Sequence, residues 1–258
     1  MLEAIFLGII QGFTEFLPIS STAHIRIVGE FLPSAQDPGA TFTAIMQIGT
    51  EIAVLLFFFN QIKEIVKGGK LGSFILLGSI PIFLLGYIGQ DFIRNNFRSL
   101  WLIAVTLIVF GVILGYLDYV GRNEKTLEKL DARDGLLYGL AQSLALVPGV
   151  SRSGATIAMG RALGYRREEA LRYSFLLAIP AVLGSGAYEL LNSLSEPTNV
   201  FSISETFAAT LTAFIVGYLV IAWLMKFVQT RSFMPFVLYR VTLGTFILIL
   251  LATGNISA

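Results

Sequence analysis

The sequence contains no cysteine, a single histidine and little charge for its length. The absence of cysteine excludes disulfide frameworks, zinc ribbons and thiol catalysis. One histidine excludes every mechanism that needs two, including zinc proteases with a His-Glu-x-x-His motif. Charged residues make up 14% of the 258 residues, against about 25% in an ordinary soluble domain. With 55% hydrophobic residues and a formal net charge of +1, the chain is neither a soluble globular protein nor a nucleic-acid binder.

Long apolar runs are what the sequence does contain. A bilayer is crossed by about 20 helical residues, and six runs reach this length. They lie roughly at 41–59, 73–90, 100–118, 171–191, 206–226 and 234–254. The sequence therefore predicts an all-α integral membrane protein that crosses the lipid bilayer of the cell membrane several times.

Two further apolar segments, roughly 2–31 and 135–165, are interrupted in the middle by proline, glycine and hydroxyl residues. The interruptions lie around Pro18 and around Pro148. Proline removes a backbone donor and breaks a helix. Non-helical backbone at membrane depth is tolerated only where it is buried in protein or lines a wet cavity. We interpret each segment as a re-entrant helical hairpin that returns to its own side of the membrane.

The two halves of the chain resemble each other at an offset near 131 residues. Gly8-x-x-Gln11 matches Gly139-x-x-Gln142, and Phe83-x-x-Gly86-Tyr87 matches Phe214-x-x-Gly217-Tyr218. We divide one compact membrane domain into repeat 1 (1–131) and repeat 2 (132–258), each with one hairpin and three spans. Because three is odd, the second repeat is inserted upside down, as in transporters with a site at the repeat interface. Chance similarity among apolar helices is the alternative.

The distribution of lysine and arginine predicts the orientation. These residues are concentrated in the loops 60–72, 119–134 and 161–172, whereas the loop 192–205 has neither. The positive-inside rule places the basic loops inside and 192–205 outside. Both termini are then expected outside. The loop 91–99, with Arg94 and Arg98, is forced outside as well and agrees least with this orientation.

Several polar residues lie in the interrupted segments, where charge is costly. A charge at the bilayer centre costs about 2.5–3.5 kcal/mol. The candidates are Glu15, His24, Arg26 and Arg152. Gln11 and Glu15 are four residues apart and share a helix face, and Ser21 shares a face with His24 if a helix resumes after the break. We expect Arg26 to lie near the hairpin's return or to extend toward the interface.

Arg152 opens a new helix inside the second segment. The start of a helix presents free backbone N–H groups and the positive end of the helix dipole. Ser151, Ser153 and Thr156 add hydroxyl donors, and the planar guanidinium suits phosphate. We interpret this turn as an anion cradle for which phosphate fits best. The alternative is a structural Glu15–Arg152 ion pair that pins the two hairpins together.

Glu15 and His24 each have more than one interpretation. Glu15 is a candidate ligand, with Gln11, of a divalent cation such as Mg²⁺ or Ca²⁺, or it orients or deprotonates a neighbour. His24 is a candidate general base for Ser21, a candidate nucleophile, or a core histidine. Glu51 receives no role, and we expect a buried partner or a position facing a cavity.

Both motifs resemble those of the undecaprenyl-diphosphate phosphatase family of the BacA type. The first signature of that family, which ends in Phe-Leu-Pro-x-Ser-Ser-Thr-Gly-His, is similar to the stretch from Gln11 to His24. The second, Pro-Gly-x-Ser-Arg-Ser-Gly-x-Thr, is matched from Pro148 to Thr156 without gaps. Ala23 stands where the family usually has glycine. Gln11 stands where it often has glutamate, which lowers the negative charge available to a metal.

The resemblance implies hydrolysis of undecaprenyl diphosphate to undecaprenyl phosphate and phosphate at the outer side of the membrane. It also implies recycling of the cell-wall carrier lipid, bacitracin resistance and dependence on a divalent cation. Carried over to this chain, the catalytic residues are Glu15, Ser21, His24 and Arg152. The expected substrate-binding residues are Gln11, Ser20, Thr22, Ser151, Ser153 and Thr156.

Ser21 attacking the terminal phosphorus, with His24 as base, is our preferred mechanism. It rests on the three-residue spacing of Ser21 and His24 beside Glu15. The main rival function is a secondary transporter or flippase of an anionic lipid or solute, which would use the same repeat interface. The expected partners are a polyprenyl diphosphate, the bilayer and, in a homodimer, a second copy of the chain.

Overall fold

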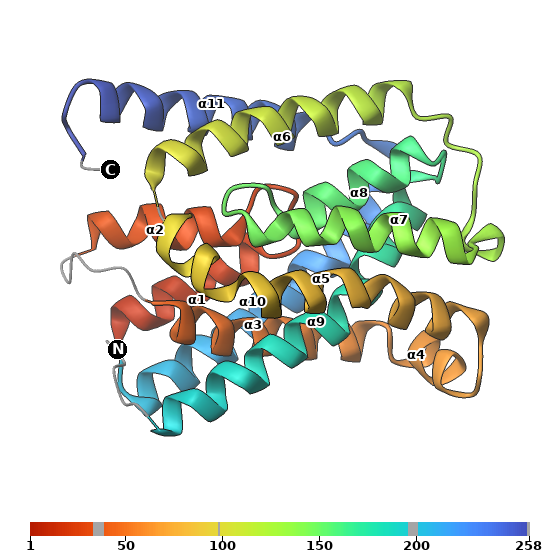
Figure 1. Ribbon diagram of the computed structural model, residues 1–258, viewed down its shortest axis with the longest axis horizontal. Helices are drawn as coiled ribbons and strands as arrows, with labels where there is room; N and C mark the ends of the chain where they lie inside the picture. Colours follow the sequence, from red (N-terminus) through yellow and green to blue (C-terminus); the bar gives the residue numbers. More distant parts are fainter. Residues whose placement is uncertain (33–38, 98, 196–200, 257–258) are drawn as a thin grey trace.

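The computed structural model describes residues 1–32, 39–97, 99–195 and 201–256, and these residues form no β-strand. Arg98 and part of the loop 192–205 lie outside the described residues. The helices are α1 (Leu2–Thr14), α2 (Ser21–Phe31), α3 (Ala40–Phe57), α4 (Phe59–Val66), α5 (Lys70–Asn96), α6 (Leu100–Val120), α7 (Ala132–Ser143), α8 (Arg152–Ala162), α9 (Arg167–Ser195), α10 (Ile203–Thr230) and α11 (Met234–Ala252). The predicted all-α class is confirmed (Figure 1).

Within the described residues, five helices are long and apolar enough to cross a membrane. They are α5, α6, α9, α10 and α11. They contain four of the last five predicted runs, and the run 234–254 extends two residues beyond the end of α11. A sixth candidate consists of α3 and α4, which are bent by 81° relative to each other. The bend lies at Phe58; α4 carries the exposed Lys63, and the exposed Lys67 follows its last residue. The run 41–59 is therefore helical, but the chain turns sharply at its end.

Each interrupted segment folds as two short helices joined by an irregular turn. In the first segment, α1 and α2 flank the turn 15–20. In the second, α7 and α8 flank a short 3₁₀ helix, Leu144–Leu146, and the turn 147–151. Each break contains a proline, at which a helix loses a backbone hydrogen bond, followed closely by serine. Pro81 and Pro180, which no serine follows as closely, lie inside the continuous helices α5 and α9.

The short helices pack reciprocally against the opposite half of the chain. α1 packs on α10, and α7 packs on α5. Both contacts depend on glycine: a Cβ added to Gly8 would lie 2.4 Å from the carbonyl oxygen of Ala209, and one added to Gly139 would lie 2.1 Å from that of Gly78. Only a residue without a side chain lets the two backbones approach this closely.

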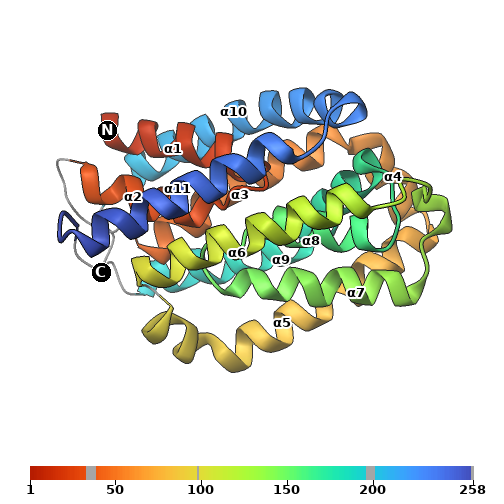
Figure 2. The same cartoon turned by 90° about the horizontal axis from the view of Figure 1, so that it is seen from above.

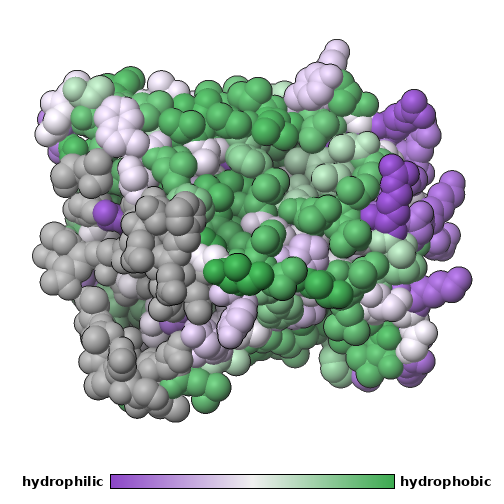
Figure 3. Space-filling model, in the orientation of Figure 1, coloured by the Kyte–Doolittle hydropathy of each residue, from purple (hydrophilic) through white to green (hydrophobic). Residues whose placement is uncertain are grey.

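Polar and apolar surfaces are separated along the long axis of the molecule. Figure 3 shows apolar side chains over the middle and hydrophilic ones gathered at one end, where Figure 1 places α4 and the α6–α7 connection. Exposed basic residues of these segments include Lys63, Lys70, Arg122 and Lys129. The N-terminus and the end of α11 lie at the opposite end (Figures 1 and 2). An apolar surface next to a polar end is what a protein that crosses a bilayer presents.

Candidate active site

Both irregular turns end in a serine with left-handed backbone. Ser20 caps α2 with φ 74°, and Ser151 caps α8 with φ 70°. Such a φ is uncommon for a residue other than glycine and costs of order 1–3 kcal/mol. Ser151 follows Ser20 by 131 positions, which is the offset of the sequence similarity. The two helix breaks therefore share the same unusual backbone conformation at the equivalent position.

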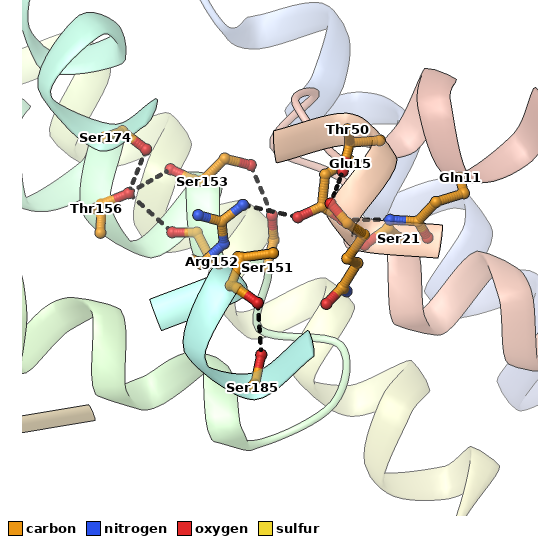
Figure 4. A network of polar contacts seen from close by, with 12 residues as sticks. Gln11, Glu15, Ser21, Thr50, Ser151, Arg152, Ser153, Thr156, Ser174 and Ser185 are labelled. Carbon is orange, nitrogen blue, oxygen red and sulfur yellow. Dashed lines mark hydrogen bonds and ion pairs between the residues drawn. The ribbon is translucent and has the colours of Figure 1, made fainter. Parts of the chain in front are cut away.

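The carboxylate of Glu15 joins three helices (Figure 4). Its Oε2 accepts hydrogen bonds from Gln11 Nε2 at 2.7 Å and from Ser21 Oγ at 2.6 Å. Its Oε1 pairs with Arg152 Nη2 at 2.7 Å. Glu15 follows the last residue of α1, Ser21 begins α2 and Arg152 begins α8. Four of the predicted site residues are thus brought together around one buried carboxylate.

The hydroxyl groups around Arg152 divide into two sets. Ser151 Oγ accepts the backbone N–H of Gly154 at 3.1 Å and lines the cavity described below. Ser153 Oγ donates to the Leu17 carbonyl at 3.1 Å and so ties the second turn to the first. Thr156 is fully buried and its hydroxyl lies 2.6 Å from that of Ser174. Ser153 and Thr156 therefore point into the protein and support the turn.

His24 has partners other than the residues of the carboxylate network. Its Nδ1 is 2.7 Å from the Ser20 carbonyl, and its Nε2 is 2.7 Å from the Tyr239 hydroxyl. The two rings are stacked, with centroids 5.5 Å apart. Since a carbonyl only accepts, Nδ1 carries a proton and Nε2 of the neutral ring accepts from tyrosine. Both ring nitrogens are thus engaged, and the hydroxyl of Ser21 donates to Glu15 instead.

A cavity of about 570 Å³ opens beside the carboxylate network, within the range of small-molecule sites. Its polar wall comes from the turns and helix starts at Glu15, Ser20, Ser21, Thr22, Ser151 and Arg152. Its opposite wall comes from α5 and α9, with the apolar residues Ile82, Phe83, Gly86, Val182 and Gly184, and α9 also contributes Ser185, Tyr188 and Glu189. The cavity is therefore amphipathic, with a charged region next to a hydrocarbon-like one.

Comparisons with known proteins identify the family of the chain. Residues 4–246 match the family model described as "Bacitracin resistance protein BacA". The chain belongs to the BacA family. It is 56% identical to the undecaprenyl-diphosphatase of Micrococcus luteus, with 100% of this chain and 99% of the relative covered. It is 53% identical to undecaprenyl-diphosphatase 2 of Agrobacterium fabrum, with 100% and 98% covered.

Oxygen atoms suited to a hard cation lie close to the site of this BacA-family chain. Glu51 on α3 is fully buried, and neither of its oxygens has a hydrogen-bond partner among the described residues. It is near enough to interact electrostatically with Glu15 and Arg152. Gln11 Oε1 is also buried and unpaired in the described structure. These orphaned oxygens fit an oxygen-only donor set.

No group of three His, Cys, Asp or Glu side chains in the described residues encloses a metal by itself. Mg²⁺ commonly takes one or two carboxylates together with phosphate oxygens.

Sequence reasoning missed two residues of the BacA site, Tyr239 and Arg240 in α11. Tyr239 contacts His24 across 215 positions of chain, and no local pattern marks that contact. Arg240 did leave a signal, because it is a charged residue inside the apolar run 234–254. Such a residue is a functional candidate by default.

Proposed function

We propose that this BacA-family chain hydrolyses undecaprenyl diphosphate to undecaprenyl phosphate and phosphate. The activity would recycle the carrier lipid of cell-wall synthesis and contribute to bacitracin resistance. The observation that carries the proposal is the Glu15–Arg152–Ser21 network at the polar wall of an amphipathic cavity. Relatives that are 56% and 50% identical over the whole chain bear the name undecaprenyl-diphosphatase.

The two walls of the cavity suit the two parts of the substrate. The diphosphate would lie against Arg152 and the first turn of α8, where the guanidinium and free N–H groups attract phosphate oxygens. The isoprenoid chain would lie between α5 and α9, against Phe83 and Val182. This placement buries apolar surface and keeps the charged head group on charged partners.

Ser21 is the proposed nucleophile, and Glu15 is the proposed proton acceptor. Ser21 Oγ already donates to Glu15 Oε2 at 2.6 Å, so the proton has a short path as the oxygen attacks the terminal phosphorus. A bond forms between Oγ and phosphorus, and the bond to the bridging oxygen breaks. Undecaprenyl phosphate leaves with that electron pair, and water then releases phosphate from the serine. Arg152 stabilises the charge on the phosphoryl oxygens.

His24 as the base for Ser21 stays a prediction from the sequence. In the conformation described here, its Nε2 is 2.7 Å from the Tyr239 hydroxyl. The imidazole would have to leave this contact in order to reach Ser21. The geometry favours Glu15 as base and gives His24 a role in holding the Ser20 carbonyl.

A divalent cation, Mg²⁺ or Ca²⁺, is the proposed cofactor. When bound, it would neutralise charge on the phosphate oxygens. Gln11 and Glu15 remain the proposed ligands from the sequence. The unpaired oxygens of Glu51 add a third candidate.

The inverted repeat with two re-entrant hairpins is part of the same proposal. It is supported by the matching backbone of Ser20 and Ser151 and by the reciprocal packing of α1 on α10 and α7 on α5. In symmetric transporters, such repeats meet at a midplane site.

We propose that the cavity opens to the outer side of the membrane. α5 and α9 begin at the basic end with Lys70 and Arg167, and the cavity residues Ile93 and Tyr188 lie toward their other ends. If the basic end is cytoplasmic, the cavity and both termini face outward. A homodimer stays a prediction.

Phosphate release by the purified chain tests the function. The chain in detergent would receive undecaprenyl diphosphate, with and without a chelator. We expect phosphate and undecaprenyl phosphate in equal amounts and a loss of rate with the chelator. A transporter or flippase would bind the lipid and release no phosphate.

A further inference from the structure

Arg240 is a fully buried arginine in α11 whose guanidinium contacts backbone carbonyl groups. Among the described residues it forms no ion pair with a carboxylate. Its hydrogen-bond acceptors are the carbonyl oxygens of Leu107 (3.1 Å), Pro18 (3.0 Å), Thr106 (3.4 Å), Gly149 (2.8 Å) and Val150 (3.0 Å). Burying a positive charge without a carboxylate partner costs free energy. A neutral side chain would avoid that cost, but it could not donate hydrogen bonds to this many carbonyl groups.

Three of these carbonyls belong to the two helix breaks. Pro18 lies in the turn before α2, and Gly149 and Val150 lie in the turn before α8. Carbonyl groups at a helix break lose their partners within the helix, and a buried one without a partner is destabilising. The guanidinium supplies donors to both turns at once, in a planar arrangement that only arginine has.

Through its contacts with both turns, Arg240 is adjacent to the residues that carry the catalytic network. Each turn ends in a serine with strained backbone, Ser20 or Ser151. That serine follows the contacted carbonyl groups within two residues. The helices that follow begin with Ser21 and Arg152, whose side chains meet on Glu15. Arg240 also borders α8, because a Cβ added to Gly154 would lie 2.9 Å from its Nη1.

We infer that Arg240 is a positioning residue for diphosphate hydrolysis. Its guanidinium holds the two turns at the separation at which Glu15, Ser21 and Arg152 meet. Arg240 does not line the cavity, so it acts through the turns and not on the substrate. The inference rests on the proposed catalytic residues.

A matched control separates positioning from general stability. Arg161 is also buried, hydrogen-bonds the carbonyls of Gly121 and Tyr165, and pairs with Asp118. It holds loops at the basic end and does not line the cavity. Replacing either arginine by lysine keeps the charge and removes the planar fork.

The experiment compares Arg240→Lys with Arg161→Lys in purified protein. Melting temperature in detergent, kcat and KM for undecaprenyl diphosphate are measured for each variant. We expect both variants to melt earlier. We expect kcat to fall about 10²-fold in Arg240→Lys with KM within about threefold, because a misplacement near 1 Å costs a catalytic group that much. Arg161→Lys keeps kcat within about threefold. A wild-type kcat in Arg240→Lys, or equal losses of kcat in both variants, would overturn the inference.

Thr106→Val provides a second test in case Arg240→Lys does not fold. The Thr106 hydroxyl donates to the Pro148 carbonyl at 2.7 Å, so this variant loosens the same turn without exposing a buried charge. We expect kcat to fall several-fold with little change in KM. An unchanged kcat would contradict the inference that the geometry of this turn positions the catalytic residues. Failure of the proposed function itself would appear as an absence of phosphate release from the wild-type chain, whatever the variants do.

Discussion

Glu15 and Arg152, which are 137 positions apart, are joined by a 2.7 Å contact between Oε1 of the carboxylate and Nη2 of the guanidinium. One residue follows the first helix of the first interrupted segment, and the other begins the second helix of the second segment. The contact therefore links the two helix breaks, one from each half of the chain. A guanidinium has five N–H donors, so Arg152 retains donors for phosphate while it neutralises Glu15.

Arg152→Ala is the first prediction. Loss of the guanidinium removes phosphate stabilisation and leaves Glu15 buried without its partner, so we expect kcat/KM to fall about 10²-fold or more. Arg152→Lys keeps the charge without the planar fork and should recover part of the rate. Phosphate release from undecaprenyl diphosphate measures both. Arg166→Ala, which removes an exposed arginine that pairs with the partly buried Glu168, is the control and should keep the wild-type rate.

Replacement of Ser21 by alanine tests the nucleophile. Because Ser21 Oγ is the donor to Glu15 Oε2, Ser21→Ala removes the attacking oxygen and leaves the ion pair in place. We expect a loss of kcat of about 10³-fold or more, with little change in melting temperature. Labelling with lipid that carries a radioactive terminal phosphate, followed by a rapid quench in detergent at neutral pH, which preserves both phosphoserine and acid-labile phosphohistidine, should give a phosphoserine at Ser21. Label on His24, or full activity of Ser21→Ala, would refute this role.

The left-handed serines yield a prediction about stability. Glycine adopts a positive φ without steric cost. Ser20→Gly should therefore raise the free energy of unfolding by about 1 kcal/mol, and the melting temperature should rise with it. Ser151 also accepts the N–H of Gly154 as a helix cap, and Ser151→Gly loses that bond. Its gain should therefore be smaller. Thermal unfolding in detergent compares the two variants, and a larger gain for Ser151→Gly would contradict the argument.

Much of the architecture could be predicted because its signals are local. Apolar runs of span length mark the long helices, and prolines mark both helix breaks. The polar motifs around Glu15 and Arg152 lie at these breaks, so their proximity follows once the two breaks are expected to meet. The ion pair offered as an alternative to the anion cradle is present, and the two interpretations are compatible.

The remaining features depend on contacts that leave no local pattern. His24 contacts Tyr239 in the last helix, and the spacing to Ser21 suggested a different partner. The bend of 81° between α3 and α4 has no proline or glycine at Phe58. Glu51 is buried close enough to Arg152 to interact with it electrostatically, but its oxygens have no hydrogen-bond partner among the described residues and it does not line the cavity. Tertiary packing determines the contact of His24, the bend between the helices and the burial of Glu51. The spacing of residues in the sequence carries no information about that packing.

Close helix packing at glycine gives a further prediction. Gly139→Ala would bring its Cβ to 2.1 Å from the Gly78 carbonyl oxygen. The two helices must then move apart, which should cost about 1–3 kcal/mol and lower the melting temperature. Gly89→Ala on α5, where a Cβ would meet the end of the Ile93 side chain at 3.3 Å, is the control. It should be neutral or stabilising, since alanine favours a helix. Similar losses in both variants would show that the close approach is not the cause.

Gly86→Leu tests where the isoprenoid chain lies. A Cβ at Gly86 has room, with Leu146 at 3.6 Å, and a longer side chain there would enter the apolar part of the cavity. We expect KM for undecaprenyl diphosphate to rise about tenfold or more, because lost burial of a few methylene groups weakens binding by that much. Hydrolysis of isopentenyl diphosphate, whose short chain buries little surface, should change far less. Gly89→Leu, on the same helix but not in the cavity wall, controls for bulk on α5. An equal loss with both substrates would mean that Gly86→Leu distorts the catalytic network, and the chain would then have to lie elsewhere.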